Sequence, residues 1–277
     1  MRNSGPRVRD QELLRIRGTR PDDLTTYERI LLARENIMKL QRDDFMASKP
    51  LLDAVIAAEP GWGEAFALAA DWHGLLVGQG WSVDRAADIA EVERLSREAL
   101  SLDASNVRAL VSYGHRKSLL YRDYDTALSL FDRALDAAPS SAQAWLRSSY
   151  TVAYLGQARE AVQRAMRAME LSPLDREAHV FFDALCVAHY TAGDYEAAAD
   201  WGLRAHGEPK VLHSTSGWTA AALAALGRTD KARDIADLLM ARLPDRRVRD
   251  VVAQHPYQDP GRRQRYGQHL LAAGCPA

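Results

Sequence analysis

The stretch of residues 141–173, SAQAWLRSSYTVAYLGQAREAVQRAMRAMELSP, decides the fold class. It holds two runs with apolar residues at helical spacing, separated at Gly156. Glycine adopts a left-handed backbone at little cost, so Gly156 ends the first helix, and Pro173 ends the second because proline cannot continue a helix. Ala161 and Ala168 lie seven residues apart, which is about two turns, so both occupy one face. The stretch therefore predicts a hairpin of two closely packed helices.

The same spacing recurs along the chain. Pro139 and Pro173 are 34 residues apart, an alanine precedes a proline by 12 residues in three places, and a glycine precedes an alanine by five residues in three places. A fixed period of this length is typical of stacked repeats that share a continuous core. We therefore predict an all-α fold, an α-α superhelix of about six helical hairpins. The alanines that take part in either pattern are Ala127, Ala161, Ala198 and Ala232, and the glycines are Gly156, Gly193 and Gly227.

Three segments follow from this spacing. Residues 1–23 read as a basic arm or linker, 24–244 as the solenoid, and 245–277 as a tail with a capping helix near residues 261–273. A terminal repeat needs a polar cover, which the tail helix would supply. The predicted repeat units are residues 24–60, 61–104, 105–139, 140–173, 174–210 and 211–244.

These spacings and residue types resemble the tetratricopeptide repeat (TPR). A narrower resemblance is to the C-terminal TPR region of bacterial class III adenylate cyclases and winged-helix transcriptional regulators. That resemblance implies an accessory module that is regulatory or binds a partner. There is no room for a cyclase or winged-helix domain before Leu24, so it implies no cyclase activity. The stretches that carry it are RPDDLTTYERILLARENIMKL (20–40), GWSVDR (80–85), ELSPLDREAHVFFDALCVAHYTAGDYEAAADW (170–201) and HPYQDPGRRQRYGQHLLAAGCP (255–276).

Composition narrows the function classes. The net charge of −1 provides no overall attraction to nucleic acid or anionic membranes, and the arginine clusters favour a solvated face or an acidic partner. There is no run of about 18 apolar residues and no apolar signal-peptide core near the start. Only two cysteines occur, Cys186 and Cys275, which indicates a reducing compartment. We expect a cytoplasmic protein that binds neither membrane nor nucleic acid.

Catalytic and metal motifs are missing from the sequence. Neither H-E-x-x-H nor Cys-x-x-Cys occurs. Cys186, His189 and Asp183 could share a helix face as metal ligands, but packing of a buried cysteine is the favoured interpretation. Cys275 is expected to be an exposed thiol. We therefore predict no enzyme activity, no metal and no cofactor.

Stacked hairpins place their first helices along a concave groove. Residues of these helices that avoid the hairpin core should line it, and their mix of types suits a polar peptide or helix. Trp81, in a long turn, either anchors a partner or folds back on the protein. The sequence thus predicts a scaffold for a protein or peptide; a small-ligand sensor using the same groove is the alternative. The candidates are Tyr27, Arg34, Asp71, Trp81, Arg108, His115, Arg147, Tyr150 and Asp183.

Overall fold

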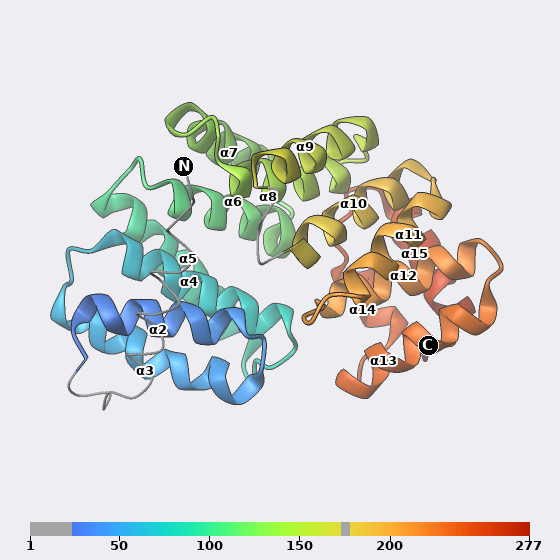
Figure 1. The fold of residues 1–277 in the computed structure, drawn as a ribbon, viewed down its shortest axis with the longest axis horizontal. Coiled ribbons are helices and arrows are strands. Elements are labelled where there is room, and N and C mark those ends of the chain that lie inside the picture. Colours follow the sequence, from blue (N-terminus) through green and yellow to red (C-terminus); the bar gives the residue numbers. More distant parts are fainter. Residues whose placement is uncertain (1–23, 173–177) are drawn as a thin grey trace, which may run out of the picture. The chain divides into compact units, whose positions relative to one another are not determined.

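The structure, a computed structural model, describes residues 24–172 and 178–277. In these two ranges all regular secondary structure is helical, which confirms the predicted all-α class (Figure 1). The chain divides into two compact units, Met1–Ala109 and Leu110–Ala277. The basic arm predicted at residues 1–23 lies outside the described residues.

Two helical hairpins make up the described part of the first unit. In the first, α2 (Thr26–Met38) packs against α3 (Arg42–Ala58), and in the second, α4 (Gly63–Gly78) packs against α5 (Arg85–Leu102). Phe45 is fully buried between them, and its carbonyl accepts a hydrogen bond of 3.0 Å from the Trp72 indole. The two hairpins therefore share one core.

The second unit contains four further hairpins. Helix α6 (Val107–Tyr121), which crosses the boundary between the units, precedes α7 (Tyr124–Ala137). The following pairs are α8 (Ala142–Tyr154) with α9 (Ala158–Leu171), α10 (Ala178–Ala192) with α11 (Tyr195–His206), and α12 (His213–Ala225) with α13 (Thr229–Arg242). The paired helices confirm the predicted α-α superhelix of helical hairpins.

The local sequence signals act as expected. Gly156 and Gly193, which follow the first helix of a pair, have φ angles of +83° and +80°. Ala161 and Ala198 in the second helices are completely buried, where their small side chains allow close packing. Helix α7 ends two residues before Pro139. Pro173 lies outside the described residues.

The C-terminal tail contains the predicted capping helix and also makes contacts with earlier hairpins. Helix α15 (Pro260–Ala272) packs on α12 as expected, but a short helix, α14 (Val248–Gln254), precedes it and was not predicted (Figure 1). The residues between α14 and α15 form hydrogen bonds with earlier hairpins. The Tyr124 hydroxyl donates to the Pro256 carbonyl (2.5 Å), and the Gln258 N–H donates to the Tyr154 carbonyl (2.9 Å). The tail thus ties the third and fourth hairpins to the last one.

Candidate partner-binding face

The structure brings together four of the nine predicted groove residues. His115 of α6 lies against Tyr150 of α8, with ring centroids 5.6 Å apart. The Tyr150 hydroxyl donates to Oδ2 of Asp183 in α10 (2.6 Å). Arg147 lies about one helical turn before Tyr150. The candidates therefore converge from three successive first helices of the second unit.

One member of this cluster was not predicted from the sequence. Thr215 of α12 donates its hydroxyl to Oδ1 of Asp183 at 2.6 Å, so both carboxylate oxygens of Asp183 are bonded. Thr215 follows Asp183 by 32 residues, about one repeat, and that spacing was the available signal. We call His115, Arg147, Tyr150, Asp183 and Thr215 the inner cluster; it crosses all four first helices of the unit.

Burial controls the electrostatics of the inner cluster. Burial raises the pKa of Asp183, although hydrogen bonds from Thr215 and Tyr150 and the charge of Arg147 oppose this. Burial, reinforced by the nearby Asp183 carboxylate, raises the pKa of Tyr150 well above its usual value. The phenol therefore stays protonated and remains a hydrogen-bond donor to Asp183.

His115 and Arg147 differ from the other cluster members in charge and in exposure. Burial and then the charges of Arg147 and Arg116 hold the pKa of His115 well below its usual value, so its ring is neutral. Its Nδ1 is buried without a hydrogen-bond partner among the described residues. His115, Tyr150 and Asp183 are buried, whereas Arg147 is partly exposed. Arg147 is therefore the group of these four that a partner can reach.

The other five candidates lie in the first unit. Tyr27 on α2 is 59% exposed, and Arg34 of α2 and Asp71 of α4 are partly exposed. Arg108 forms an ion pair with Glu64. The Trp81 ring meets the Phe45 ring edge-on, with centroids 5.1 Å apart. Trp81 thus folds back on the protein, and its contact lies in the preceding hairpin.

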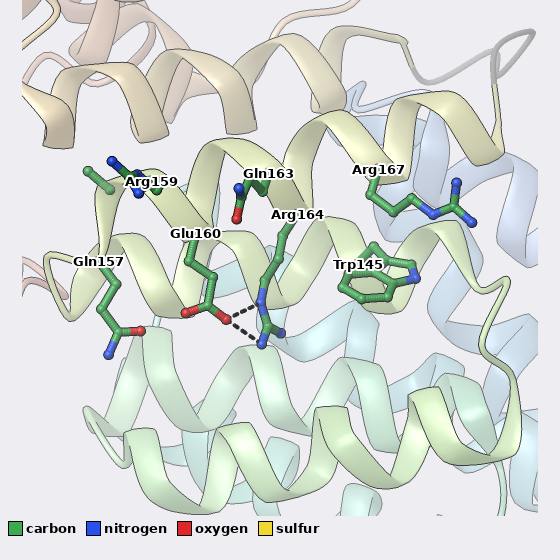
Figure 2. A pocket seen from close by; sticks show the side chains of 8 residues that line it. Trp145, Gln157, Arg159, Glu160, Gln163, Arg164 and Arg167 are labelled. Carbon is green, nitrogen blue, oxygen red and sulfur yellow. Dashed lines mark hydrogen bonds and ion pairs between the residues drawn. The ribbon is translucent and has the colours of Figure 1, made fainter.

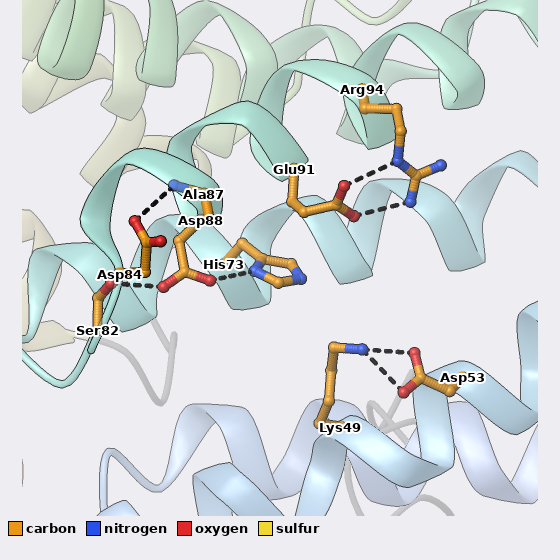
Figure 3. A network of polar contacts seen from close by, with 9 residues as sticks. All are labelled: Lys49, Asp53, His73, Ser82, Asp84, Ala87, Asp88, Glu91 and Arg94. Carbon is orange, nitrogen blue, oxygen red and sulfur yellow. Dashed lines mark hydrogen bonds and ion pairs between the residues drawn. The ribbon is translucent and has the colours of Figure 1, made fainter.

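The turn that contains Trp81 is held by a polar network. His73 Nδ1 lies 2.7 Å from Oδ1 of Asp88, and the Ser82 hydroxyl donates to the other oxygen at 2.5 Å (Figure 3). Because Ser82 and His73 both bond to Asp88, the histidine does not bond to the serine as the base of a nucleophilic pair would. The network therefore connects the turn to α4 and α5.

The cysteines are both buried. Cys186 is inaccessible, and burial raises the pKa of its thiol well above the usual value. Asp183, the metal ligand considered beside it, instead accepts from Tyr150 and Thr215. Within residues 24–172 and 178–277, no three His, Cys, Asp or Glu side chains are arranged to hold a metal ion. The expectation that Cys275 is exposed was wrong: the tail fold leaves it 7% exposed.

Tail residues occupy the first-helix face beside the inner cluster. The Tyr257 hydroxyl lies 2.6 Å from that of Thr191 in α10, and its ring meets Tyr154 of α8 and Trp218 of α12 edge-on. Arg262 donates to the Thr191 carbonyl at 2.7 Å. The sequence prediction for the tail specified only a capping helix, and the apolar ring of Tyr257 was the available signal for burial of this stretch.

No protein-family model matches the chain, and no curated protein sequence matches it. Among the described helices, none has the length and apolar character needed to cross a bilayer.

Solved structures do resemble the chain. PilW, a type IV pilus biogenesis factor, is 19% identical over 80% of this chain and 94% of its own, with a TM-score of 0.55. A chain of the APC/C hetero-tetramer Cut9–Hcn1 is 13% identical over 91% of this chain and 46% of its own, with a TM-score of 0.60. A tetratricopeptide repeat protein from Parabacteroides merdae ATCC 43184 is 14% identical over 87% of this chain and 92% of its own (TM-score 0.48). The likeness to the first two structures is one of fold, and together with the paired helices it supports a TPR-like α-α superhelix.

Proposed function

We propose that this protein is a non-catalytic scaffold that binds a partner protein or peptide on the first-helix face of its second unit. The observation that carries the proposal is the inner cluster, in which Arg147 is partly exposed beside the buried Tyr150–Asp183–Thr215 bonds. These bonds hold α8, α10 and α12 in place before a partner arrives. Binding then requires little reorganisation, which favours affinity.

The partner chemistry follows from Arg147. A guanidinium presents several donors that match a carboxylate or backbone carbonyls, whereas a metal or a cation would be repelled. A second candidate, a small-ligand sensor at the same face, would be favoured by a deep apolar pocket with converging polar groups. Two open clefts among the described residues lie elsewhere, along α9 and around Arg122, Tyr124 and Arg263. This placement favours the scaffold.

We also propose that the protein acts by binding alone, without a cofactor or metal. Two observations support this proposal: Ser82 donates to Asp88 and not to a histidine base, and burial raises the pKa of the inaccessible Cys186 thiol. Residues 24–244 would form the recognition solenoid and residues 245–277 its tail. The remaining candidates in the first unit, Tyr27, Arg34, Asp71, Trp81 and Arg108, would add contacts of their own.

A cytoplasmic role in a nucleotide-cyclase or transcription-regulator pathway is the finer form of the proposal. Its support is the sequence resemblance alone, chiefly residues 170–201 and 255–276. The near-zero net charge supports the expectation that neither nucleic acid nor a membrane is the partner.

The test compares two charge reversals. The wild-type chain is used to capture partners from native extract of the source cells. Each captured partner is then produced in pure form, and its affinity is measured for the wild type, Arg147→Glu and Arg249→Glu. The Arg249 side chain is 79% exposed on α14, so it serves as the matched control. We expect Arg147→Glu to weaken binding at least tenfold, about 1.4 kcal/mol, and Arg249→Glu to leave it unchanged. Equal affinities for all three chains would refute the proposed face.

A further inference from the structure

A second binding surface lies along α9. An open cleft of about 780 Å³ follows this helix and is lined by Trp145, Gln157, Arg159, Glu160, Arg164 and Arg167 (Figure 2). All but Trp145 come from α9 or the residue before it. Gln157 and Arg159 stand at one end of the row, and Trp145 and Arg167 at the other. We call this feature the α9 cleft; it belongs to the second helix of its hairpin and is distinct from the inner cluster.

The charge of the α9 cleft is unbalanced. Three arginines face one acidic residue, Glu160, and Arg164 already binds Glu160 through Nε (2.8 Å) and Nη2 (2.7 Å). The Arg164 Nη1 atom is buried and has no acceptor among the described residues. Arg159 is exposed, and the 3.2 Å pair of Arg167 with Glu170 is exposed on both sides and therefore weak. The cleft thus offers guanidinium donors to an incoming anion.

The backbone adds to the positive potential. Helix α9 begins at the same end as Arg159, and Gln157 makes no side-chain hydrogen bond to the first turn. The first backbone N–H groups of a helix have no partner within the helix and carry a partial positive charge. A carboxylate at this end can therefore interact with both the helix terminus and Arg159.

Trp145 provides an apolar surface at the opposite end. Its indole Nε1 donates to the Pro139 carbonyl at 3.0 Å, which fixes the ring. The Arg164 guanidinium lies 5.8 Å from the ring centroid and packs over the same side chain. A fixed, partly buried ring of this kind suits an apolar side chain of a partner.

We propose that the α9 cleft binds an extended acidic segment of a partner protein. Arg159 and Arg167 are eight residues apart, which is about 12 Å along a helix. An extended chain covers that distance in about four residues. The segment therefore carries two acidic residues spaced about four apart, with an apolar residue next to the one at Arg167 that packs on Trp145. A single aromatic ring without others interleaved disfavours a nucleic-acid strand.

The test follows the indole N–H signal of Trp145 by nuclear magnetic resonance. The chain has 6 tryptophans, so its indole region is sparse, and Trp145→Phe assigns the signal. The probe is the peptide acetyl-Gly-Glu-Gly-Gly-Leu-Glu-Gly-amide, compared with the same peptide carrying Lys for Glu. We expect a saturable shift with the acidic peptide that weakens as salt is added, and no shift with the lysine peptide.

Variants locate the binding. The double variant Arg159→Glu, Arg167→Glu should bind the acidic peptide at least tenfold more weakly than the wild type, whereas Arg249→Glu should bind it with unchanged affinity. Both cleft arginines are exposed, so the double variant should keep the circular dichroism and melting temperature of the wild type. The proposal fails if the wild-type signal does not shift, if both variants lose the same affinity, or if single-stranded oligothymidylate binds more tightly than the peptide.

Discussion

His255 should make the docked tail sensitive to acid. Its side chain is 5% exposed and packs against Trp218 and Tyr266, with ring centroids 5.1 and 4.6 Å away. Burial, and then the charges of Arg122, Arg246 and Arg263, lower the pKa of His255 to about 3. Because the usual pKa is about 6.5, the unfolded chain takes up a proton at a higher pH than the folded chain does.

The sign and size of the effect follow from this difference. Between about pH 6.5 and pH 3 the unfolded state binds more protons at this position, so stability falls as the pH falls. Each unit of pKa difference is worth about 1.4 kcal/mol, so lowering the pH from about 7 to about 5 should cost roughly 2 kcal/mol. The burial of the ring leaves little solvent screening to reduce this value.

The assay compares the wild type with His255→Asn. Asparagine does not titrate, and it can accept the hydrogen bond that the Tyr257 N–H donates to His255 Nδ1. The free energy of unfolding is measured with urea at about pH 7 and pH 5, together with hydrogen exchange in α14 and α15. The buried His115 contributes to both proteins and cancels in the comparison. The variant should lose roughly 2 kcal/mol less than the wild type on acidification; identical losses would refute the reasoning.

Three further substitutions test the packing. Asp183→Ala leaves the buried Tyr150 and Thr215 hydroxyls without their shared acceptor. It should lower the free energy of unfolding measured with urea by about 2–4 kcal/mol, and a decrease under about 1 kcal/mol would contradict the described bonds. Gly202→Ala places a methyl group against Thr219 and should lower stability by about 1–3 kcal/mol, whereas Gly61→Ala, where a Cβ meets nothing within 4 Å, is the control that should not. Tyr257→Phe removes the bond to Thr191 and should speed hydrogen exchange in the tail by roughly fivefold, about 1 kcal/mol; unchanged exchange would show that this bond does not hold the tail.

The hairpins were predictable because their signals are local. Gly156 must adopt a positive φ, and Ala161 must be small, for reasons that involve only one helix pair. These requirements repeat at a fixed spacing, so each repeat strengthens the inference from the others. The tail lacks such repetition. Its position depends on contacts between residues far apart in sequence, such as Tyr124 with Pro256, and no spacing rule relates those positions.

The candidate site was predictable in part for the same reason. Tyr150 and Asp183 occupy similar places in neighbouring repeats, so periodicity placed them on one face. Periodicity places a residue on a helix face but does not give its depth, so buried and accessible residues on that face look alike in the sequence. Tyr150 is 4% exposed and Asp183 is 2% exposed, while Arg147 is partly exposed. Which member is accessible depends on how closely the first helices pack, and this is a property of the assembled unit.

The inner cluster and the tail connect the same helices. Tyr150, Asp183 and Thr215 bond α8 to α10 and α12, and Tyr257 of the tail contacts side chains of these same three helices. A change in the spacing of these helices must therefore alter both sets of contacts, which gives a physical route for coupling between tail docking and the partner binding proposed at Arg147. By reciprocity, a partner that prefers the docked spacing must also stabilise the tail, and protection of α14 and α15 from hydrogen exchange would measure that coupling directly.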